Sequence, residues 1–215
     1  MDLKKGAKRG KLAPEGEKME VELKYSCPNG AVFEEILTYA AQVQQGPERK
    51  IQMQTDYYDT PERTLRERFW TLRLRRENDE RVVCCKTRGS RSGALSSHNE
   101  WECEAEDLRS GVKQLVAQGA PEELLAIADR AERFCGAAFL RISADLVLES
   151  GTVAELSCDR GKLLGAKSEQ SLCEVELELK AGPVEPMLAY GAALAARFGL
   201  KEESRSKLAR AMELE

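Results

Sequence analysis

The sequence predicts an α+β fold: an eight-stranded antiparallel β-barrel, or tunnel, with a charged interior and helices packed on the outside. Three observations lead to this prediction. Several segments alternate apolar with ionisable residues, the ionisable positions are acidic or basic in a recurring pattern, and amphipathic helical segments lie between them. About eight such strands can close into a barrel without open edges, which places the charged face inside and the apolar faces under the helices.

Carboxylates occupy alternate positions on several predicted strands. The segment EVELK at 20–24 places two glutamates and a lysine on one face, with Val21 and Leu23 on the other. The segment EVELEL at 174–179 repeats this pattern, and a helix would scatter its glutamates around the axis. Acidic residues also alternate at 100–104 and at 155–159. These segments therefore predict strands that share one acidic face.

Basic residues follow the same rule on other predicted strands. Arg73 and Arg75 alternate with leucines, and Arg141 faces away from its apolar neighbours Leu140 and Ile142. The segment ending at Lys86 is patterned less clearly. Any one such face is usually solvated. Several like-charged faces together would repel one another unless a bound ion offset the repulsion.

We therefore infer one face that carries an acidic cluster for a divalent metal and a basic cluster for phosphate. Carboxylate oxygens are hard ligands, so Mg²⁺ or Mn²⁺ is expected rather than zinc. Arginine binds phosphate through two parallel hydrogen bonds, whereas lysine acts as a point charge. The sequence contains neither a P-loop nor a G-x-G-x-x-G motif, so side chains must hold the phosphate.

The chain organisation predicts one domain. Residues 1–17 form an expected disordered basic tail, and residues 18–215 a single tunnel domain. Segment 88–99 is rich in Gly and Ser and is predicted to be a loop containing His98, which has no evident partner. Helices are predicted at 31–44 before Gly46-Pro47, at 107–116 with Asp107 as its cap, after Pro121 as the first helical residue, and at 186–198 before Gly199.

Composition excludes several classes of protein. The 215 residues include 33 Lys and Arg against 37 Asp and Glu, a net charge of −4, which argues against a general nucleic-acid coat. No apolar run reaches the ~20 residues of a membrane span, and no signal peptide is evident. Seven cysteines without C-x-x-C spacing indicate reduced thiols and a cytoplasmic protein. Because the sequence has a single histidine, a histidine-rich zinc site and a Ser-His-Asp triad are not expected.

The order of the charged motifs resembles the CYTH superfamily, the triphosphate tunnel metalloenzymes, over about residues 19–212. This superfamily includes inorganic triphosphatases, thiamine triphosphatases and class IV adenylate cyclases. The motifs that carry the resemblance are EVELK at 20–24, YYDTP at 57–61, LRLR at 72–75, Lys86, EWE at 100–102, Arg141, CDRG at 158–161, EVELEL at 174–179, and Ser206-Lys207.

The resemblance implies the fold given above and a role for each matching residue. The expected catalytic residues are Glu20, Glu22, Lys24 and Asp159. The expected triphosphate-binding residues are Lys24, Arg73, Arg75, Lys86, Arg141 and Lys207. The expected ligands of Mg²⁺ or Mn²⁺ are Glu20, Glu22, Glu100, Glu102, Asp159, Glu174 and Glu176, and the resemblance does not decide between Glu100 and Glu102.

The predicted function is divalent-metal-dependent hydrolysis of inorganic tripolyphosphate or a related triphosphate. Two alternatives remain open: a class IV-type adenylate cyclase, and a non-catalytic module that binds polyphosphate. The expected partner is a small-molecule triphosphate, with neither nucleic acid nor membrane, and the oligomeric state is not predicted. Lys207 lies at the start of a predicted C-terminal helix, where a lysine would ordinarily be solvated, so its role depends on the motif alone.

Overall fold

The computed structural model describes residues 18–87 and 90–214, so the tail expected at 1–17 lies outside the described residues. The strands are β1 (Lys18–Ser26), β2 (Gln44–Asp59), β3 (Thr71–Glu77), β4 (Glu80–Lys86), β5 (Ser90–Ser92), β6 (Leu95–Glu104), β7 (Glu132–Val147), β8 (Val153–Leu164), β9 (Glu169–Ala181) and β10 (Lys201–Glu202). The α-helices are α1 (Val32–Ala40), α2 (Thr64–Glu67), α3 (Leu108–Ala117), α4 (Glu123–Ala128), α5 (Glu185–Phe198) and α6 (Lys207–Met212).

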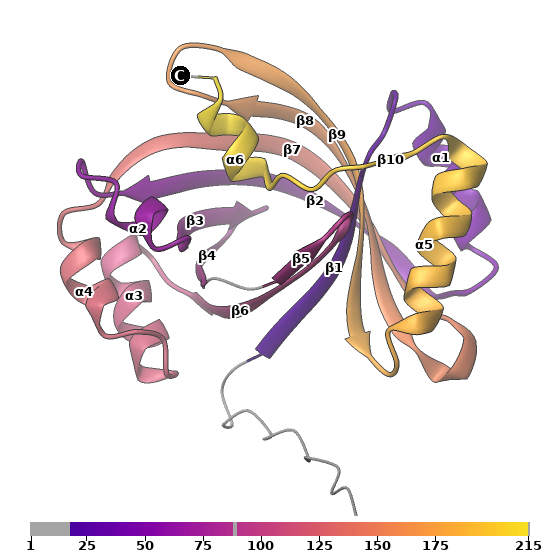
Figure 1. The fold of residues 1–215 in the computed structure, drawn as a ribbon, viewed down its shortest axis with the longest axis horizontal. Coiled ribbons are helices and arrows are strands. Elements are labelled where there is room, and N and C mark those ends of the chain that lie inside the picture. The colour runs from indigo at the N-terminus through magenta and orange to yellow at the C-terminus, as the bar shows by residue number, and fades with distance from the viewer. Residues whose placement is uncertain (1–17, 88–89, 215) are drawn as a thin grey trace, which may run out of the picture.

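Eight strands form a closed antiparallel barrel, as the alternation of the sequence predicted. Their order is β1-β9-β8-β7-β2-β3-β4-β6, and β6 pairs back with β1 to close the ring. The short strands β5 and β10 add to β6 and β1. Figure 1 shows the curved wall of long strands with helices around it. Closure satisfies the strand edges and gives the sheet one inner and one outer face.

The outer face of one side of the barrel packs against α1 and α5. Leu23 of β1 and Leu177 of β9 are buried there against Ile36 of α1 and Leu194 of α5. Gly191 lets α5 approach closely, because a Cβ at this position would lie 2.6 Å from a methyl carbon of Leu23. The apolar residues that alternate with the charged ones therefore form an outer core.

A second outer core lies beneath α3 and α4. Val83 of β4 and Trp101 of β6 pack against Leu115 of α3 and Leu124 of α4. Asp107 caps α3 as predicted: its carboxylate accepts a hydrogen bond of 2.8 Å from the backbone N–H of Ser110. Figure 1 shows this helix pair on the opposite side of the barrel from α5.

The C-terminal helix α6 packs over side chains of the inner face at one end of the barrel. Leu208, Ala211 and Met212 of α6 contact a cluster that includes Met53 and Phe139 of the barrel wall. The inner side chains of the wall that α6 covers are therefore mainly apolar. The arrangement brings the first residue of α6, Lys207, to the interior.

Three local predictions are wrong at their boundaries. The helix predicted at 31–44 ends at Ala40, and Gly46-Pro47 lies within β2. Pro121 precedes α4, which begins at Glu123. Of the loop predicted at 88–99, residues 88–89 lie outside the described residues. Most of the remainder is strand, because β5 pairs with β6 and β6 pairs with β1. This pairing offsets the weak strand preference of the Gly and Ser residues. The helix predicted at 186–198 matches α5, which ends at Phe198 and is capped by Gly199 with a φ of 65°.

No helix in the described part of the chain is long and apolar enough to cross a membrane.

Candidate active site

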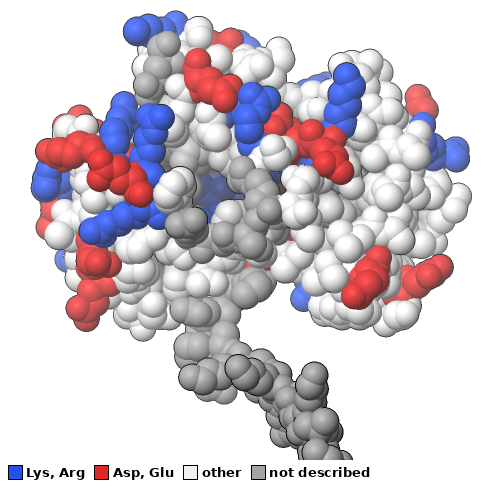
Figure 2. Space-filling model, in the orientation of Figure 1, with Lys and Arg blue, Asp and Glu red and all other residues white. Residues whose placement is uncertain are grey.

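The barrel interior holds a cavity of about 740 Å³ whose lining contains both acidic and basic side chains. Eleven of the thirteen predicted site residues line it: Glu20, Glu22, Lys24, Arg73, Arg75, Lys86, Glu100, Glu102, Arg141, Glu176 and Lys207. The other two, Asp159 and Glu174, are completely buried behind the lining. In the view of Figure 2, basic side chains are visible inside the hollow near the middle of this face of the molecule.

Strand register brings these residues together from distant parts of the chain. Lys24 of β1 lies opposite Glu176 of β9, and Asp159 of β8 lies between Arg141 of β7 and Glu174 of β9. Residues directly opposite on antiparallel strands point to the same face. The alternation seen in the sequence therefore becomes two neighbouring rows of inward-pointing charges, with Lys24 and Glu176 in one row and Glu174, Asp159 and Arg141 in the next.

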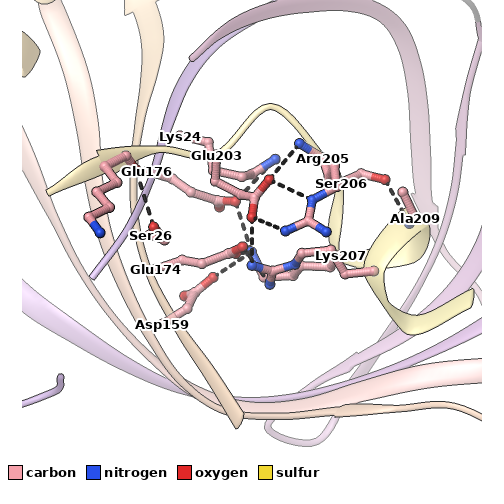
Figure 3. Close-up of polar contacts among 12 residues, drawn as sticks. Lys24, Ser26, Asp159, Glu174, Glu176, Glu203, Arg205, Ser206, Lys207 and Ala209 are labelled. Carbon is pink, nitrogen blue, oxygen red and sulfur yellow. Dashed lines mark hydrogen bonds and ion pairs between the residues drawn. The ribbon is translucent and has the colours of Figure 1, made fainter. Parts of the chain in front are cut away.

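Lys207 joins three of the buried carboxylates. Its ammonium nitrogen lies 2.9 Å from Asp159, 2.6 Å from Glu174 and 2.8 Å from Glu176 (Figure 3). Burial would lower the pKa of Lys207, but the three carboxylates raise it well above its ordinary value. The lysine that the helix start would ordinarily leave in solvent is thus a charged group inside the barrel.

Arg141 and Lys24 complete the charge balance around Glu176. Arg141 donates hydrogen bonds of 2.7 Å to both carboxylate oxygens of Asp159 and one of 2.6 Å to Glu176. Lys24 donates a hydrogen bond of 3.0 Å to Glu22 and lies 3.6 Å from Glu176. Burial would raise the pKa of Glu176, but Lys207, Lys24 and Arg141 lower it well below its ordinary value. Glu176 is therefore ionised.

A second ionic cluster lies where β1, β3, β4 and β6 meet. Lys86 forms ion pairs with Glu20 and, at 3.3 Å, with Glu100, which also accepts a hydrogen bond of 3.3 Å from Arg73. The thiol of Cys84 donates to the same carboxylate at 2.8 Å. Burial would raise the pKa of Glu100, but the charges of Lys86 and Arg73 lower it to about 2.

The structure distinguishes Glu100 from Glu102, which the sequence could not. The Glu100 side chain is 13% exposed and lies beside Glu20 and Lys86. The Glu102 side chain is 53% exposed and lies 3.6 Å from Arg75. Glu100 is therefore the carboxylate inside the cavity, while Glu102 lies where its lining meets solvent.

Two arginines in the lining retain buried donors without a protein partner. Among the described residues, the Nε–H groups of Arg73 and Arg75 are buried and donate to no hydrogen-bond acceptor. A buried guanidinium N–H without an acceptor is costly. Both arginines also line the cavity, where the rest of each guanidinium can meet an anionic ligand. This observation favours the predicted role of both residues in binding phosphate.

Sequence reasoning missed two basic residues. Arg210 is buried, and its guanidinium lies 2.7 Å from Glu174. A signal for it existed, because Arg210 lies three residues after Lys207 and thus shares its helix face. Arg49 lines the cavity and donates a hydrogen bond of 2.7 Å to Asp145. It was missed because the preceding Gly46-Pro47 was interpreted only as the end of a helix, so no strand was predicted around Arg49.

The expectation that His98 lies in a loop without a partner is wrong. His98 belongs to β6, lines the cavity opposite Glu20, and its Nδ1 lies 3.4 Å from the carbonyl oxygen of Thr87. Burial, and then the positive charge of Lys86, lower the pKa of His98. The imidazole is therefore a neutral polar group of the lining at pH 7.

The donor set fits a hard divalent cation. Asp159, Glu174 and Glu176 each offer a carboxylate oxygen, and these three atoms lie within 4.8 Å of one another. Oxygen donors of this kind suit Mg²⁺ or Mn²⁺. In this structure the ammonium of Lys207 balances the same three carboxylates, so a metal bound by all three would compete with it.

The fold and the interior define a protein class: a closed antiparallel barrel in which carboxylates and basic side chains face one cavity. The sequence matches the CYTH domain over residues 18–212, and the chain belongs to this family.

Similar proteins agree with this assignment. The inorganic triphosphatase of Haemophilus influenzae is 26% identical over 134 residues, which cover 62% of this chain and 38% of that protein. The chain thus matches well under half the length of this curated relative. Among solved structures, HpAC1 of Hippeastrum has a TM-score of 0.62 at 16% identity, covering 88% of this chain and 93% of that one. HpAC1 is described as having a dominant triphosphatase activity.

Two further structures show how widely the fold occurs. PH1819 of Pyrococcus horikoshii has a TM-score of 0.57 at 19% identity and covers 91% of this chain and 99% of that one. The RNA triphosphatase domain of a mimivirus mRNA capping enzyme has a TM-score of 0.54 at 12% identity, with 86% and 89% covered. At these identities the likeness establishes the fold alone.

Proposed function

We propose that the protein is a divalent-metal-dependent triphosphatase that hydrolyses inorganic tripolyphosphate or a related triphosphate inside the barrel. The observation that carries the proposal is one enclosed cavity whose lining includes both the predicted phosphate-binding residues, Arg73 and Arg75 among them, and carboxylates. The basic side chains suit a polyanion, and the carboxylates suit its counter-cation. The family and the names of its relatives support the same reading.

Each basic residue has a task that follows from its chemistry. Arg73, Arg75 and Arg141 can each present two N–H groups to non-bridging oxygens of the phosphate chain. Lys24, Lys86 and Lys207 supply point charges that balance the negative charge on the transferred phosphoryl group. Donors that are already in place stabilise this charge without reorganisation during the reaction.

The acidic residues would hold the metal and orient water. We assign Mg²⁺ or Mn²⁺ to Glu20, Glu22 and Glu176, the neighbouring carboxylates that line the cavity. The group of Asp159, Glu174 and Glu176 could hold a second ion in place of the Lys207 ammonium. Such an ion, when bound, neutralises phosphate oxygens and polarises phosphorus. Burial would raise the pKa of Glu22, but Lys24 lowers it, so Glu22 is ionised. Asp159 would act indirectly, by holding Arg141 and Lys207 in position. A carboxylate of the lining would orient a water molecule, whose oxygen bonds to the terminal phosphorus as the P–O anhydride bond breaks.

A phosphate-release assay on the full chain tests the proposal. Tripolyphosphate, thiamine triphosphate and ATP are each supplied with Mg²⁺ or Mn²⁺, and we expect inorganic phosphate and a diphosphate as products, with no release in EDTA. Cyclic AMP from ATP would instead indicate the cyclase alternative. Binding of tripolyphosphate without any turnover would indicate the non-catalytic module.

A further inference from the structure

Two cysteines lie directly opposite each other on neighbouring strands, outside the barrel cavity. The register of β1 and β9 pairs Ser26 with Glu174. At the next position, the backbone N–H of Cys27 donates a hydrogen bond of 2.9 Å to the carbonyl oxygen of Cys173. Opposite residues of antiparallel strands have Cα atoms about 4.5–5.5 Å apart and side chains on the same face. Disulfides span Cα distances of about 4.4–6.8 Å, so the backbone already has the geometry that a disulfide needs.

The thiols of this pair are also in contact. Cys27 and Cys173 both lie on the outer face of the barrel, in or against the apolar cluster beneath α1 and α5. Burial raises the pKa of Cys27 to about 12, and the neighbouring Cys173 thiol contributes to this rise. The Cys27 thiol donates a hydrogen bond of 3.1 Å to the carbonyl oxygen of Asn29, which it would give up on bonding to Cys173. Joining the two sulfurs therefore needs rotation of side chains rather than movement of strands.

This arrangement is unique among the cysteines that the structure describes. No other cysteine faces a cysteine across a strand pair: Cys84 faces Arg73 and Glu102, Cys85 faces Leu72 and Trp101, Cys103 faces Val83, Cys135 faces Tyr57, and Cys158 faces Ile142 and Val175. Cys158 is the nearest third thiol, but it lies diagonal to Cys173, and diagonal neighbours are about 7–8 Å apart. That separation is too long for a disulfide without movement of the backbone.

The two thiols differ in their access to solvent. Cys173 is partly exposed, whereas Cys27 is only 8% exposed. Burial raises the pKa of Cys173, and both the Cys27 thiol and the positive charge of Arg160, directly opposite on β8, partly offset this rise. A dissolved oxidant therefore reaches Cys173 first, and Cys27 is placed to react with the oxidised sulfur. Because both thiols are mostly protonated at neutral pH, the oxidation should be slow.

We propose that Cys27 and Cys173 form a reversible disulfide under a peroxide, linking the end of β1 to β9 on the outside of the barrel. The Cys173 sulfur attacks one peroxide oxygen, the O–O bond breaks, and water leaves while a sulfenic acid remains. The Cys27 sulfur then attacks the sulfur of the sulfenic acid, so an S–S bond forms as the S–O bond breaks and a second water leaves. The thiols lose two electrons and both protons, which the two waters carry away, and a dithiol reductant reverses the reaction.

The bond would stabilise the fold without touching the cavity. Residues 27 and 173 are far apart in the sequence, so the bond closes a long loop in the unfolded chain and lowers its conformational entropy. Lys24 and Glu176, on the same two strands, line the cavity, whereas the two cysteines lie on the outer face. The inference therefore does not depend on the proposed triphosphatase function.

The test exposes the full folded chain to hydrogen peroxide, alkylates the remaining thiols before unfolding, and maps the linked peptides by mass spectrometry. We expect one peptide pair joined through Cys27 and Cys173 and the loss of two of the seven free thiols. The melting temperature should rise by about 5 °C or more, and dithiothreitol should reverse the rise. C173S should show neither the linked peptides nor the rise. C103S removes another partly exposed thiol, one that faces Val83, and should behave as the parent protein.

The linked peptides are sought in the parent protein, so the result does not depend on whether a variant folds. A disulfide between any other two cysteines would overturn the proposal. Oxidation of Cys173 to a sulfinic acid with Cys27 still free would overturn it as well, because Cys27 would then be out of reach. Seven unmodified thiols after treatment with peroxide would have the same consequence.

Discussion

The ammonium nitrogen of Lys207 lies 2.6 Å from a carboxylate oxygen of Glu174, a side chain with no exposed surface. The contact joins α6, near the C-terminus, to β9 in the barrel wall. Glu174 also lies 2.7 Å from the guanidinium of Arg210, one turn further along α6. The short helix is therefore held to the barrel interior by buried ion pairs as well as by its apolar face.

Replacing Lys207 by Met should destabilise the fold. The substitution leaves Asp159, Glu174 and Glu176 without their shared cation, and loss of one partner of a buried pair costs about 3–5 kcal/mol. Urea unfolding monitored by circular dichroism measures the change. K162M, which breaks an exposed pair with Glu169, should cost less than about 1 kcal/mol. Equal effects of both variants would contradict a buried role for Lys207.

Divalent metal should partly rescue the K207M variant if the three carboxylates form a metal site. Removal of the ammonium leaves three oxygen donors within 4.8 Å of one another. Because a ligand that binds only the folded state stabilises it, Mg²⁺ or Mn²⁺ should raise the melting temperature of K207M more than that of the parent protein. Melting curves of both proteins with and without millimolar metal measure this effect. An equal shift of the melting temperature in both proteins would argue against metal binding by the three carboxylates.

Replacing Arg73 by Lys should weaken binding of the triphosphate. A lysine keeps the charge but loses the paired N–H groups, including the buried Nε that has no partner among the described residues. We expect kcat/KM for a triphosphate to fall about tenfold. The control R109K changes an exposed arginine on α3 and should leave kcat/KM unchanged. An R73K enzyme with parental kinetics would contradict a bidentate contact.

Acid should remove the stabilising contribution of Glu100. Lys86 and Arg73 lower the pKa of this carboxyl to about 2 in the folded protein, whereas its ordinary value is 4.5. A carboxyl with a depressed pKa in the folded state stabilises the fold above pH 4.5 and loses that contribution as the pH falls toward 2. Unfolding free energies from pH 6 to 2.5 should therefore drop less steeply for E100Q than for the parent protein, and parallel curves would refute the assignment.

The alternation of apolar and ionisable residues along single strands predicted most of the residues that face the cavity. Glu22, Lys24 and Glu176 lie on the inner face because side chains on a strand point alternately to its two faces, which a sequence shows directly. Lys207 and Arg210 could not be placed in that way, because their position depends on where α6 packs. The motif match alone suggested Lys207, and the spacing of Arg210 three residues later was a signal that the sequence analysis did not use.

The errors have a common physical cause. Residues 96–99 are polar and follow a Gly/Ser-rich stretch, so local composition favours a loop, but their backbone pairs with β1 and closes the barrel. His98 was misjudged for the same reason, since a loop residue has no fixed neighbours. Strand pairing between distant segments overrides local preference, and a single sequence does not show which segments pair.

The most direct test of the central claim is phosphate release by the E22Q variant. Glu22 is a buried carboxylate of the cavity, 3.0 Å from Lys24, and glutamine keeps its size while removing its charge. With Mg²⁺ or Mn²⁺ and a triphosphate, we expect the parent protein and the outer-helix control E34Q to release phosphate. E22Q should remain folded by circular dichroism and lose at least about a hundredfold in kcat/KM. Parental activity in folded E22Q would contradict catalysis inside the barrel.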